Sequence, residues 1–315
     1  MSLPGLTTLP LPMPWELGTV NVHLVDLDDG FLLVDAGLST PECFAALEAG
    51  LAQQGIGWRD IRTLLITHLH PDHVGLATKI RELTGARLLM HRLDVEQLGL
   101  AVRAGRPVHF DEATKLAGVP QELRERMLVR LSDVRRDYHE LRADWELEGG
   151  ERVNVKGESL EVVWTPGHSL GHVCLYSPEH HYLIAGDHLL EKTTPNVGWR
   201  AGMDTLGMYL DSLRLLEPLD IDWVIPSHGA PFQGHRERIQ AIIRHHDDRC
   251  QTILAHLADG PHTIHELVAK MWLRRLSSFH HHFAVMEILA HVEYLRRRGP
   301  VMAEARPDGA LNFFS

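Results

Sequence analysis

The chain has 315 residues, of which 44% are hydrophobic and 23% charged, a composition typical of a globular protein with a large buried core. Its net charge of -11 gives no reason to expect a general attraction to nucleic acid. The three cysteines, Cys43, Cys174 and Cys250, are scattered, so we expect buried thiols rather than a disulfide framework or a paired thiolate metal site.

The first 17 residues lack the basic start of a signal peptide and contain four prolines. No apolar run in the sequence is long enough to cross a bilayer. These features predict a cytoplasmic protein that does not enter a membrane.

The first hundred residues alternate between strand and helix patterns. Apolar runs predict strands at 20–25, 30–34, 60–67 and 87–91. Helices are expected at 41–54, with Thr40 as the cap, and at 74–83, where Gly85 ends the helix. This alternation is typical of an α/β fold, in which functional residues gather at the ends of strands.

One segment after the buried strand at 60–67 is rich in metal ligands. It places three imidazoles and one carboxylate within six residues, namely His68, His70, Asp72 and His73. Imidazole and carboxylate groups are common ligands of zinc, iron and manganese. His68 and His70 can point the same way on an extended turn, while Asp72 and His73 open the next helix and face a neighbouring position. The spacing can therefore serve two ions rather than one.

Residues from about 94 to 150 form an insertion with mostly helical sequence. Between 120 and 145 the apolar residues recur at steps of three and four, which predicts one long amphipathic helix. The stripe consists of Leu123, Met127, Leu131, Val134, Tyr138, Leu141 and Trp145. The helix could pack on the core or on a second subunit of a homodimer, or the insertion could cap the metal loop, and these alternatives are compatible.

Strand patterns resume after the insertion, and three of the strands end at a further possible ligand. The strands are expected at 152–155, 159–164, 173–176, 181–185 and 223–225. The residues at their ends are His168, Asp187 and His228. Together with the first cluster they give seven nitrogen and oxygen ligands on loops at one edge of a sheet.

Five motifs in this order resemble the metallo-β-lactamase superfamily over roughly residues 20 to 230. They are Asp35-Ala36-Gly37, His68-x-His70-x-Asp72-His73, Thr165-Pro166-Gly167-His168, Gly186-Asp187 and Pro226-Ser227-His228-Gly229. The resemblance implies an α/β fold, a four-layer αββα sandwich with a dinuclear metal site between its sheets.

The resemblance also implies a role for each candidate residue. The first metal would be held by His68, His70 and His168, and the second by Asp72, His73 and His228. Asp187 would bridge the two ions, and Asp35 would orient a histidine ligand. Two divalent ions, Zn²⁺ first and Mn²⁺ or Fe²⁺ as alternatives, would turn water into a hydroxide nucleophile, with Asp72 as the catalytic group that accepts or relays a proton.

Departures from known branches of the superfamily restrict the substrate. At the position of His70, flavodiiron oxidoreductases resemble the pattern His-x-Glu-x-Asp, with a glutamate. The histidine here disfavours a redox di-iron centre. Leu190 stands where quorum-quenching lactonases usually show a tyrosine, and residues 188–196 lack the glutathione-binding segment of glyoxalase II enzymes. We therefore expect a hydrolase of an ester, thioester, lactone or phosphoester of a small molecule. The alternative is a single-strand-directed endoribonuclease with the same metals.

The last 80 residues resemble a winged-helix-like tail, as in the branch that includes a mitochondrial β-lactamase-like endoribonuclease. Helices are expected at 236–258, 263–272 and 283–298, and hairpin strands at 301–305 and 310–314. We therefore divide the chain into a catalytic domain, 1–235, and a C-terminal domain, 236–315.

The charge of this tail is nearly balanced, with 11 Lys and Arg against 9 Asp and Glu. Arg296, Arg297 and Arg298 could contact phosphates, but arginines at a helix C-terminus also interact well with its dipole. A structural or dimerisation role is favoured over nucleic-acid binding.

Other histidines and aromatic residues are secondary candidates. His172, His188 and His235 could support the ligands or contact substrate, and packed or exposed positions are equally compatible. Trp199 and Tyr209 could line the pocket, although aromatic residues are more often core. The run from 280 to 282 is three histidines, which we expect on the exposed face of a helix.

Overall fold

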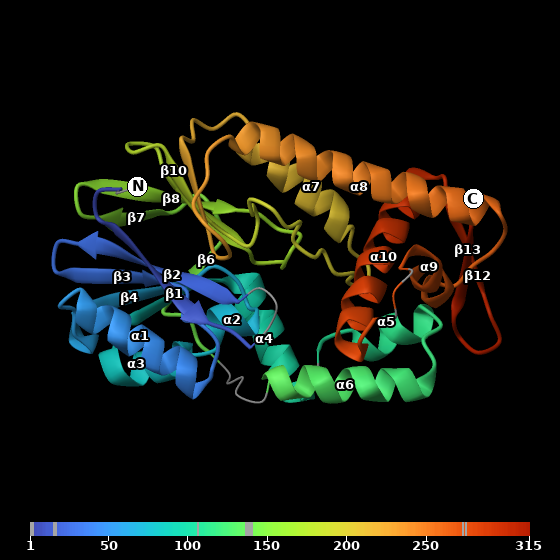
Figure 1. Cartoon of the computed structure of the whole chain (residues 1–315), viewed down its shortest axis with the longest axis horizontal. Helices are drawn as coiled ribbons and strands as arrows, with labels where there is room; N and C mark the ends of the chain where they lie inside the picture. Colours follow the sequence, from blue (N-terminus) through green and yellow to red (C-terminus); the bar gives the residue numbers. More distant parts are fainter. Residues whose placement is uncertain (1–2, 15–17, 106, 136–140, 273, 275) are drawn as a thin grey trace.

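The computed structural model describes residues 3–14, 18–105, 107–135, 141–272, 274 and 276–315. It has a β-sandwich at one end and a helical part at the other, and the long helix α8 runs from one to the other (Figure 1).

The first sheet has six strands in the order β1-β2-β3-β4-β5-β6. They are β1 (Leu6–Pro12), β2 (Thr19–Leu27), β3 (Gly30–Val34), β4 (Ile61–Ile66), β5 (Arg87–His91) and β6 (Trp145–Leu147). β1, β2 and β3 are antiparallel, whereas β3 to β6 are parallel. Its outer face is covered by α1 (Pro41–Gln53) and α3 (Ala77–Thr84) (Figure 1).

The second sheet has five strands in the order β11-β10-β9-β8-β7. They are β7 (Arg152–Val155), β8 (Glu158–Trp164), β9 (Val173–Ser177), β10 (Tyr182–Gly186) and β11 (Trp223–Pro226). Helices α7 (Thr205–Leu216) and α8 (His235–Ala258) pack on its outer face.

The two sheets enclose a core built from alternating apolar side chains. Leu32 and Leu65 of the first sheet pack in one cluster with Leu175 and Ile184 of the second, and all four are fully buried. Separate clusters join each sheet to its own helices. The expected four-layer αββα arrangement is confirmed, and all three cysteines are buried.

The helical part combines the insertion with the C-terminal region. It contains α4 (Arg92–Ala104), α5 (Phe110–Leu116), α6 (Gln121–Arg135), α9 (Ile264–Met271), α10 (Ser278–Arg298) and the hairpin of β12 (Met302–Ala305) and β13 (Leu311–Phe314). α10 packs against α5, α6, α7, α8 and α9. The helices and hairpin of the tail occur in the expected order, although α10 begins five residues earlier than expected.

The long helix expected from 120 to 145 is wrong at its end, because Trp145 begins β6 and pairs with Leu89. The backbone N–H of Asp144 donates to the Leu88 carbonyl at 2.8 Å, and its carboxylate accepts from the Leu88 N–H at 2.8 Å. These hydrogen bonds with β5 at the edge of the sheet determine the conformation of Asp144 and Trp145, although the spacing of the apolar residues favours a helix. Tyr138 and the side chains of Leu131 and Val134 lie outside the described part of the chain.

Two smaller differences have simple causes. Pro10 and Pro12 do not prevent strand β1, because β1 is an edge strand and its outer side needs no ladder donors. The helix expected at 74–83 is divided into α2 (Pro71–Val74) and α3. Gly75 lies between them, and a side chain there would meet the backbone of Pro71, Ser39 and Gly37 at 2.5 to 2.8 Å. No helix in the described ranges is both long and apolar enough to span a membrane.

Candidate metal centre

The ligand-rich loop is held in place by the end of strand β3. Asp35 follows β3 with a left-handed backbone (φ 64°), which aspartate adopts more easily than most residues. Its carboxylate accepts from the backbone N–H of Thr67 at 2.8 Å and contacts Nδ1 of His73 at 2.7 Å. As expected, Asp35 orients a histidine, whose Nε2 is then directed toward the other candidate ligands.

The first group brings together His68, His70, His168 and Asp187, whose ligand atoms all lie within 4.8 Å of one another. Nε2 of His68 is 3.0 Å from Nδ1 of His70 and 3.2 Å from Nε2 of His168. Oδ2 of Asp187 is 3.5 Å from Nε2 of His168. Loops after β4, β8 and β10 therefore converge on one point.

The second group consists of Asp72, His73 and His228, again within 4.8 Å. Nε2 of His228 lies 3.4 Å from Oδ2 of Asp72 and 3.3 Å from Oδ1 of Asp187. Nε2 of His73 lies 3.6 Å from the same oxygen of Asp187. The two oxygens of Asp187 thus face different groups.

The side chains of both groups fit divalent cations. Nε2 of His73, Nε2 of His228 and Oδ1 of Asp187 are buried without a hydrogen-bond partner, which is costly unless an ion satisfies them. Burial lowers the pKa of His68 and His70 well below the usual value, so their rings are neutral and can offer a lone pair.

The negative charge of the site lies on two carboxylates, Asp187 of the first group and Asp72 of the second. Burial alone would lower the pKa of His228, but Asp187 and Asp72 raise it to about 10. Burial opposes ionisation of Asp187, but His228 and His73 hold its pKa well below the usual value. The carboxylates are therefore compensated by protonated rings, and a divalent cation can take over that role.

The candidate ligands are themselves fixed by backbone carbonyls. Nδ1 of His168 is 2.8 Å from the carbonyl oxygen of Asn196, and Nδ1 of His228 is 2.8 Å from that of Thr19. Buried His172 contributes indirectly, because its Nε2 accepts from the backbone N–H of Asp187 at 3.1 Å. Each contact directs a ligand atom inward, as metal sites require.

Asp94 is a further fixed point that sequence analysis missed. This fully buried carboxylate accepts from the N–H of Leu69 at 2.9 Å, the hydroxyl of Ser169 at 2.7 Å and the N–H of Gly171 at 2.6 Å. It therefore links the loop of His68 to that of His168. The available signal was an acidic residue three positions after the strand at 87–91.

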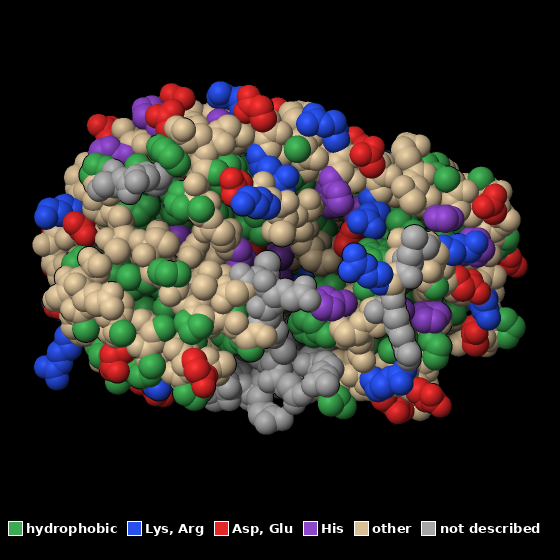
Figure 2. All heavy atoms as spheres, in the orientation of Figure 1, with side chains coloured by type: hydrophobic (Ala, Val, Ile, Leu, Met, Phe, Trp, Pro, Cys, Tyr) green, Lys and Arg blue, Asp and Glu red, His purple; other side chains and the backbone are tan. Residues whose placement is uncertain are grey.

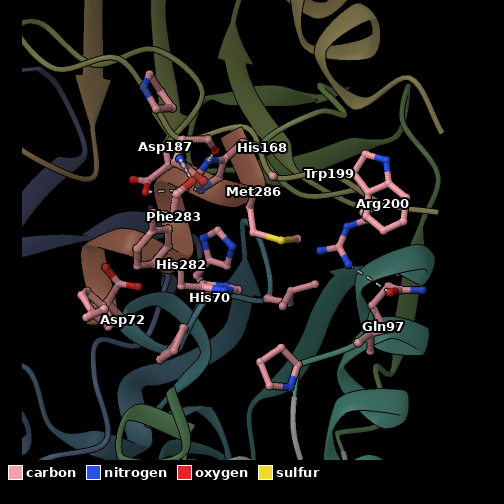
Figure 3. Close-up of a pocket in the computed structure, with 18 of the residues that line it drawn as sticks. His70, Asp72, Gln97, His168, Asp187, Trp199, Arg200, His282, Phe283 and Met286 are labelled. Carbon is pink, nitrogen blue, oxygen red and sulfur yellow. Dashed lines mark hydrogen bonds and ion pairs between the residues drawn. The ribbon is translucent and has the colours of Figure 1, made fainter. Parts of the chain in front are cut away.

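A pocket of about 450 Å³ opens beside both groups. His70, Asp72, His168 and Asp187 lie on one side, and Trp199, Arg200 and Gln97 on the other (Figure 3). Figure 2 shows the hollow between the sandwich and the helical part, with histidine side chains at its floor.

The insertion and the C-terminal helix both supply walls of this pocket. Insertion residues that line it include Gln97, Ala101, Val108 and Phe110, and α10 adds Phe283 and Met286. The expectation of an exposed histidine face on α10 is wrong for His282, which is 7% exposed and lines the pocket, as does His280. His282 is buried because α10 packs against α5, where the ring of His282 lies near Phe110. Trp199 lines the pocket, whereas Tyr209 is core.

Comparisons with known proteins agree with this geometry. Residues 15–228 match the family model described as the metallo-beta-lactamase superfamily. The chain belongs to this superfamily. Residues 250–315 match the metallo-beta-lactamase-like C-terminal domain. Membership of the superfamily, together with the two ligand groups, makes the protein a metal-dependent hydrolase.

Solved structures and a curated relative match nearly the whole chain. A metallo-beta-lactamase family protein from Thermus thermophilus is 35% identical with a TM-score of 0.84, covering 99% of both chains. A beta-lactamase domain protein from Burkholderia ambifaria is 28% identical with a TM-score of 0.88. The match covers 99% of the present chain and 92% of the Burkholderia chain. The probable metallo-hydrolase YqjP of Bacillus subtilis (strain 168) is 26% identical over 86% of each chain.

Proposed function

We propose that this metallo-β-lactamase superfamily member hydrolyses an ester, thioester, lactone or phosphoester of a small molecule with two divalent ions. The first ion would be held by His68, His70 and His168, the second by Asp72, His73 and His228, with Asp187 between them. Zinc suits this set of imidazoles and carboxylates best, and manganese or iron would also bind it. When bound, such ions lower the pKa of water and stabilise negative charge on the substrate.

Side chains of the protein would accept the proton and keep the ligands in position. Asp72 lines the pocket, so a carboxylate oxygen that is not holding an ion can accept a proton from water at that position. Asp35 keeps the ring of His73 in one orientation, and Asp94 keeps the two loops of the first group together. The pocket walls exclude bulk water around the reacting group.

The observation that carries the proposal is the pocket itself. It is bounded by Ala101, Val108, Phe110, Phe283 and Met286, and such a partly apolar pocket of about 450 Å³ suits a small molecule. A nuclease would instead need a basic groove toward the substrate chain. On the face in Figure 2, acidic and basic side chains are interspersed rather than gathered.

The three arginines at the end of α10 support the same proposal, because each has a partner within the chain. Arg296 and Arg297 pair with Glu293, and Arg297 also donates to the carbonyl of Gly202. Arg298 pairs with Asp204 at 2.8 Å. These contacts favour a structural role of the C-terminal domain, 236–315, which would complete the pocket of the catalytic domain, 1–235.

A substrate panel tests the proposal. Purified protein loaded with zinc or manganese is assayed with generic ester, thioester, lactone and bis-phosphodiester substrates and with labelled single-stranded RNA. Hydrolysis of at least one small-molecule class that is lost with Asp72→Ala supports the proposal. Cleavage of RNA alone would replace it with the endoribonuclease.

A further inference from the structure

Arg200 lies on the pocket wall opposite the candidate metal ligands, and its guanidinium points into the pocket (Figure 3). Among the described residues that line the pocket, it is the one Lys or Arg. Between it and the ligands lies the side chain of Met286 from α10 (Figure 3). The pocket thus has a cation at the end remote from the metal-binding side chains.

Hydrogen bonds made by Arg200 and by its neighbour Trp199 help to hold Arg200 in this position. The N–H of Trp199 donates to the carbonyl of Met286 at 3.1 Å, and the N–H of Met203 donates to the carbonyl of Arg200 at 3.1 Å. Nη1 of Arg200 donates to Oε1 of Gln97 on α4 at 3.3 Å. This bond helps to orient the guanidinium. Both the insertion and α10 therefore contribute to its position.

Asp94 is the buried carboxylate close to Arg200. Its oxygens accept hydrogen bonds from Leu69, Ser169 and Gly171, as described above. The charge of Arg200 opposes the rise in the pKa of Asp94 that burial causes. The attraction to Asp94 lowers the free-energy cost of keeping Arg200 half-buried. The carboxylate oxygens of Asp94 face the loops of His68 and His168, where their hydrogen-bond donors lie.

We propose that Arg200 determines the substrate class: a molecule with an apolar segment that ends in an oxyanion at the end remote from the bond to be cleaved. The inference rests on the proposed function, because the reacting group is placed at the two ion-binding groups. The apolar segment would contact Met286, Phe283 and Val108. The planar guanidinium would bind a terminal carboxylate or phosphate through paired N–H donors.

Binding of product-like probes to the ion-loaded protein tests the inference without turnover. Straight-chain acids with six, eight and ten carbons are compared with the α,ω-diacids of the same length, so that one carboxylate can reach the ions and the other Arg200. At the best length, the wild-type protein should bind the diacid about tenfold more tightly than the monoacid. Monoalkyl phosphates with and without an ω-carboxylate, and their ω-phosphate analogues, show which oxyanion is preferred.

Variants identify the residue responsible. Arg200→Leu should abolish the preference for the diacid, whereas Arg200→Lys should retain part of it. Arg152→Leu is the matched control, because Arg152 is exposed on β7 and should not alter the preference. Thermal unfolding and ion content establish that each variant is folded and loaded.

Two results would overturn the inference: an equal affinity for diacid and monoacid at every length, or an unchanged preference in Arg200→Leu. Failure of the proposed function would be seen in a different experiment. The substrate panel would then show no hydrolysis of small molecules, even if the preference for the diacid depends on Arg200.

Discussion

Oδ1 of Asp187 lies 3.3 Å from Nε2 of His228, while Oδ2 of the same carboxylate lies 3.5 Å from Nε2 of His168. One side chain thus reaches histidines from two separate groups. A carboxylate in this position can share one oxygen with each of two cations. This relationship is the structural basis for proposing a dinuclear site rather than two unrelated clusters.

Asp94→Asn should weaken ion binding although Asp94 is in neither ligand group. An amide offers one acceptor oxygen, so at least one of the buried donors at Leu69, Ser169 and Gly171 loses its partner. We expect a loss of about 1–3 kcal/mol in unfolding free energy and a roughly tenfold or larger loss of ion affinity. Urea unfolding and chelator competition measure these. Asp211→Asn, at an exposed position on α7, is the control. Unchanged ion affinity would show that Asp94 does not organise the loops.

Met286→Trp should block the pocket without emptying the metal centre. Met286 is half-buried on α10 and lines the pocket, so a larger side chain there reduces the space for substrate. We expect kcat/KM for the best small-molecule substrate to fall at least about tenfold, with unchanged ion content. Leu215→Trp, at an exposed position on α7, is the control. Full activity of Met286→Trp would mean that substrate does not use this pocket.

The protein should lose stability as the pH falls below neutral because of a buried histidine pair. Nδ1 of His246 is 3.0 Å from Nε2 of His291, whose Nδ1 donates to the carbonyl of Glu287 at 2.8 Å. Burial lowers the pKa of His246 to about 2 and that of His291 to about 4. Both pKa values lie below the usual 6.5, so the unfolded chain binds more protons once the pH falls below 6.5.

Each of these histidines then contributes a loss of about 1.4 kcal/mol per pH unit between pH 6.5 and its folded pKa. Urea unfolding of ion-free protein from pH 7 to pH 4 measures the slope. His246→Asn keeps a donor toward His291 but cannot titrate, so it should make the slope shallower. The same slope in this variant would contradict the assignment.

The strand ends that carry the candidate ligands were predictable because their signals are local. An apolar run followed by His168, Asp187 or His228 specifies both the strand and the loop after it, and parallel packing brings such ends together. The αββα fold followed from these motifs through the family resemblance. Thr40 and Gly85 likewise mark the ends of α1 and α3, because capping depends on neighbouring residues.

The remaining features depend on contacts between distant segments. Asp94 is one acidic residue among many until the fold places Ser169 and Gly171 beside it. His282 is buried only because α10 packs against the insertion. Trp145 follows the helical spacing, yet pairing with β5 determines its conformation. The pocket wall combines residues from the insertion and from α10, and periodicity carries no information about such contacts.

Ion content of the wild-type protein and of Asp187→Ala tests the dinuclear centre most directly. Mass spectrometric metal analysis after dialysis should give about two divalent ions per wild-type chain. Asp187→Ala should hold fewer and lose hydrolytic activity, because it removes the carboxylate that faces both groups. A consistent single ion in the wild-type protein, or full ion content with retained activity in Asp187→Ala, would contradict the two-ion centre.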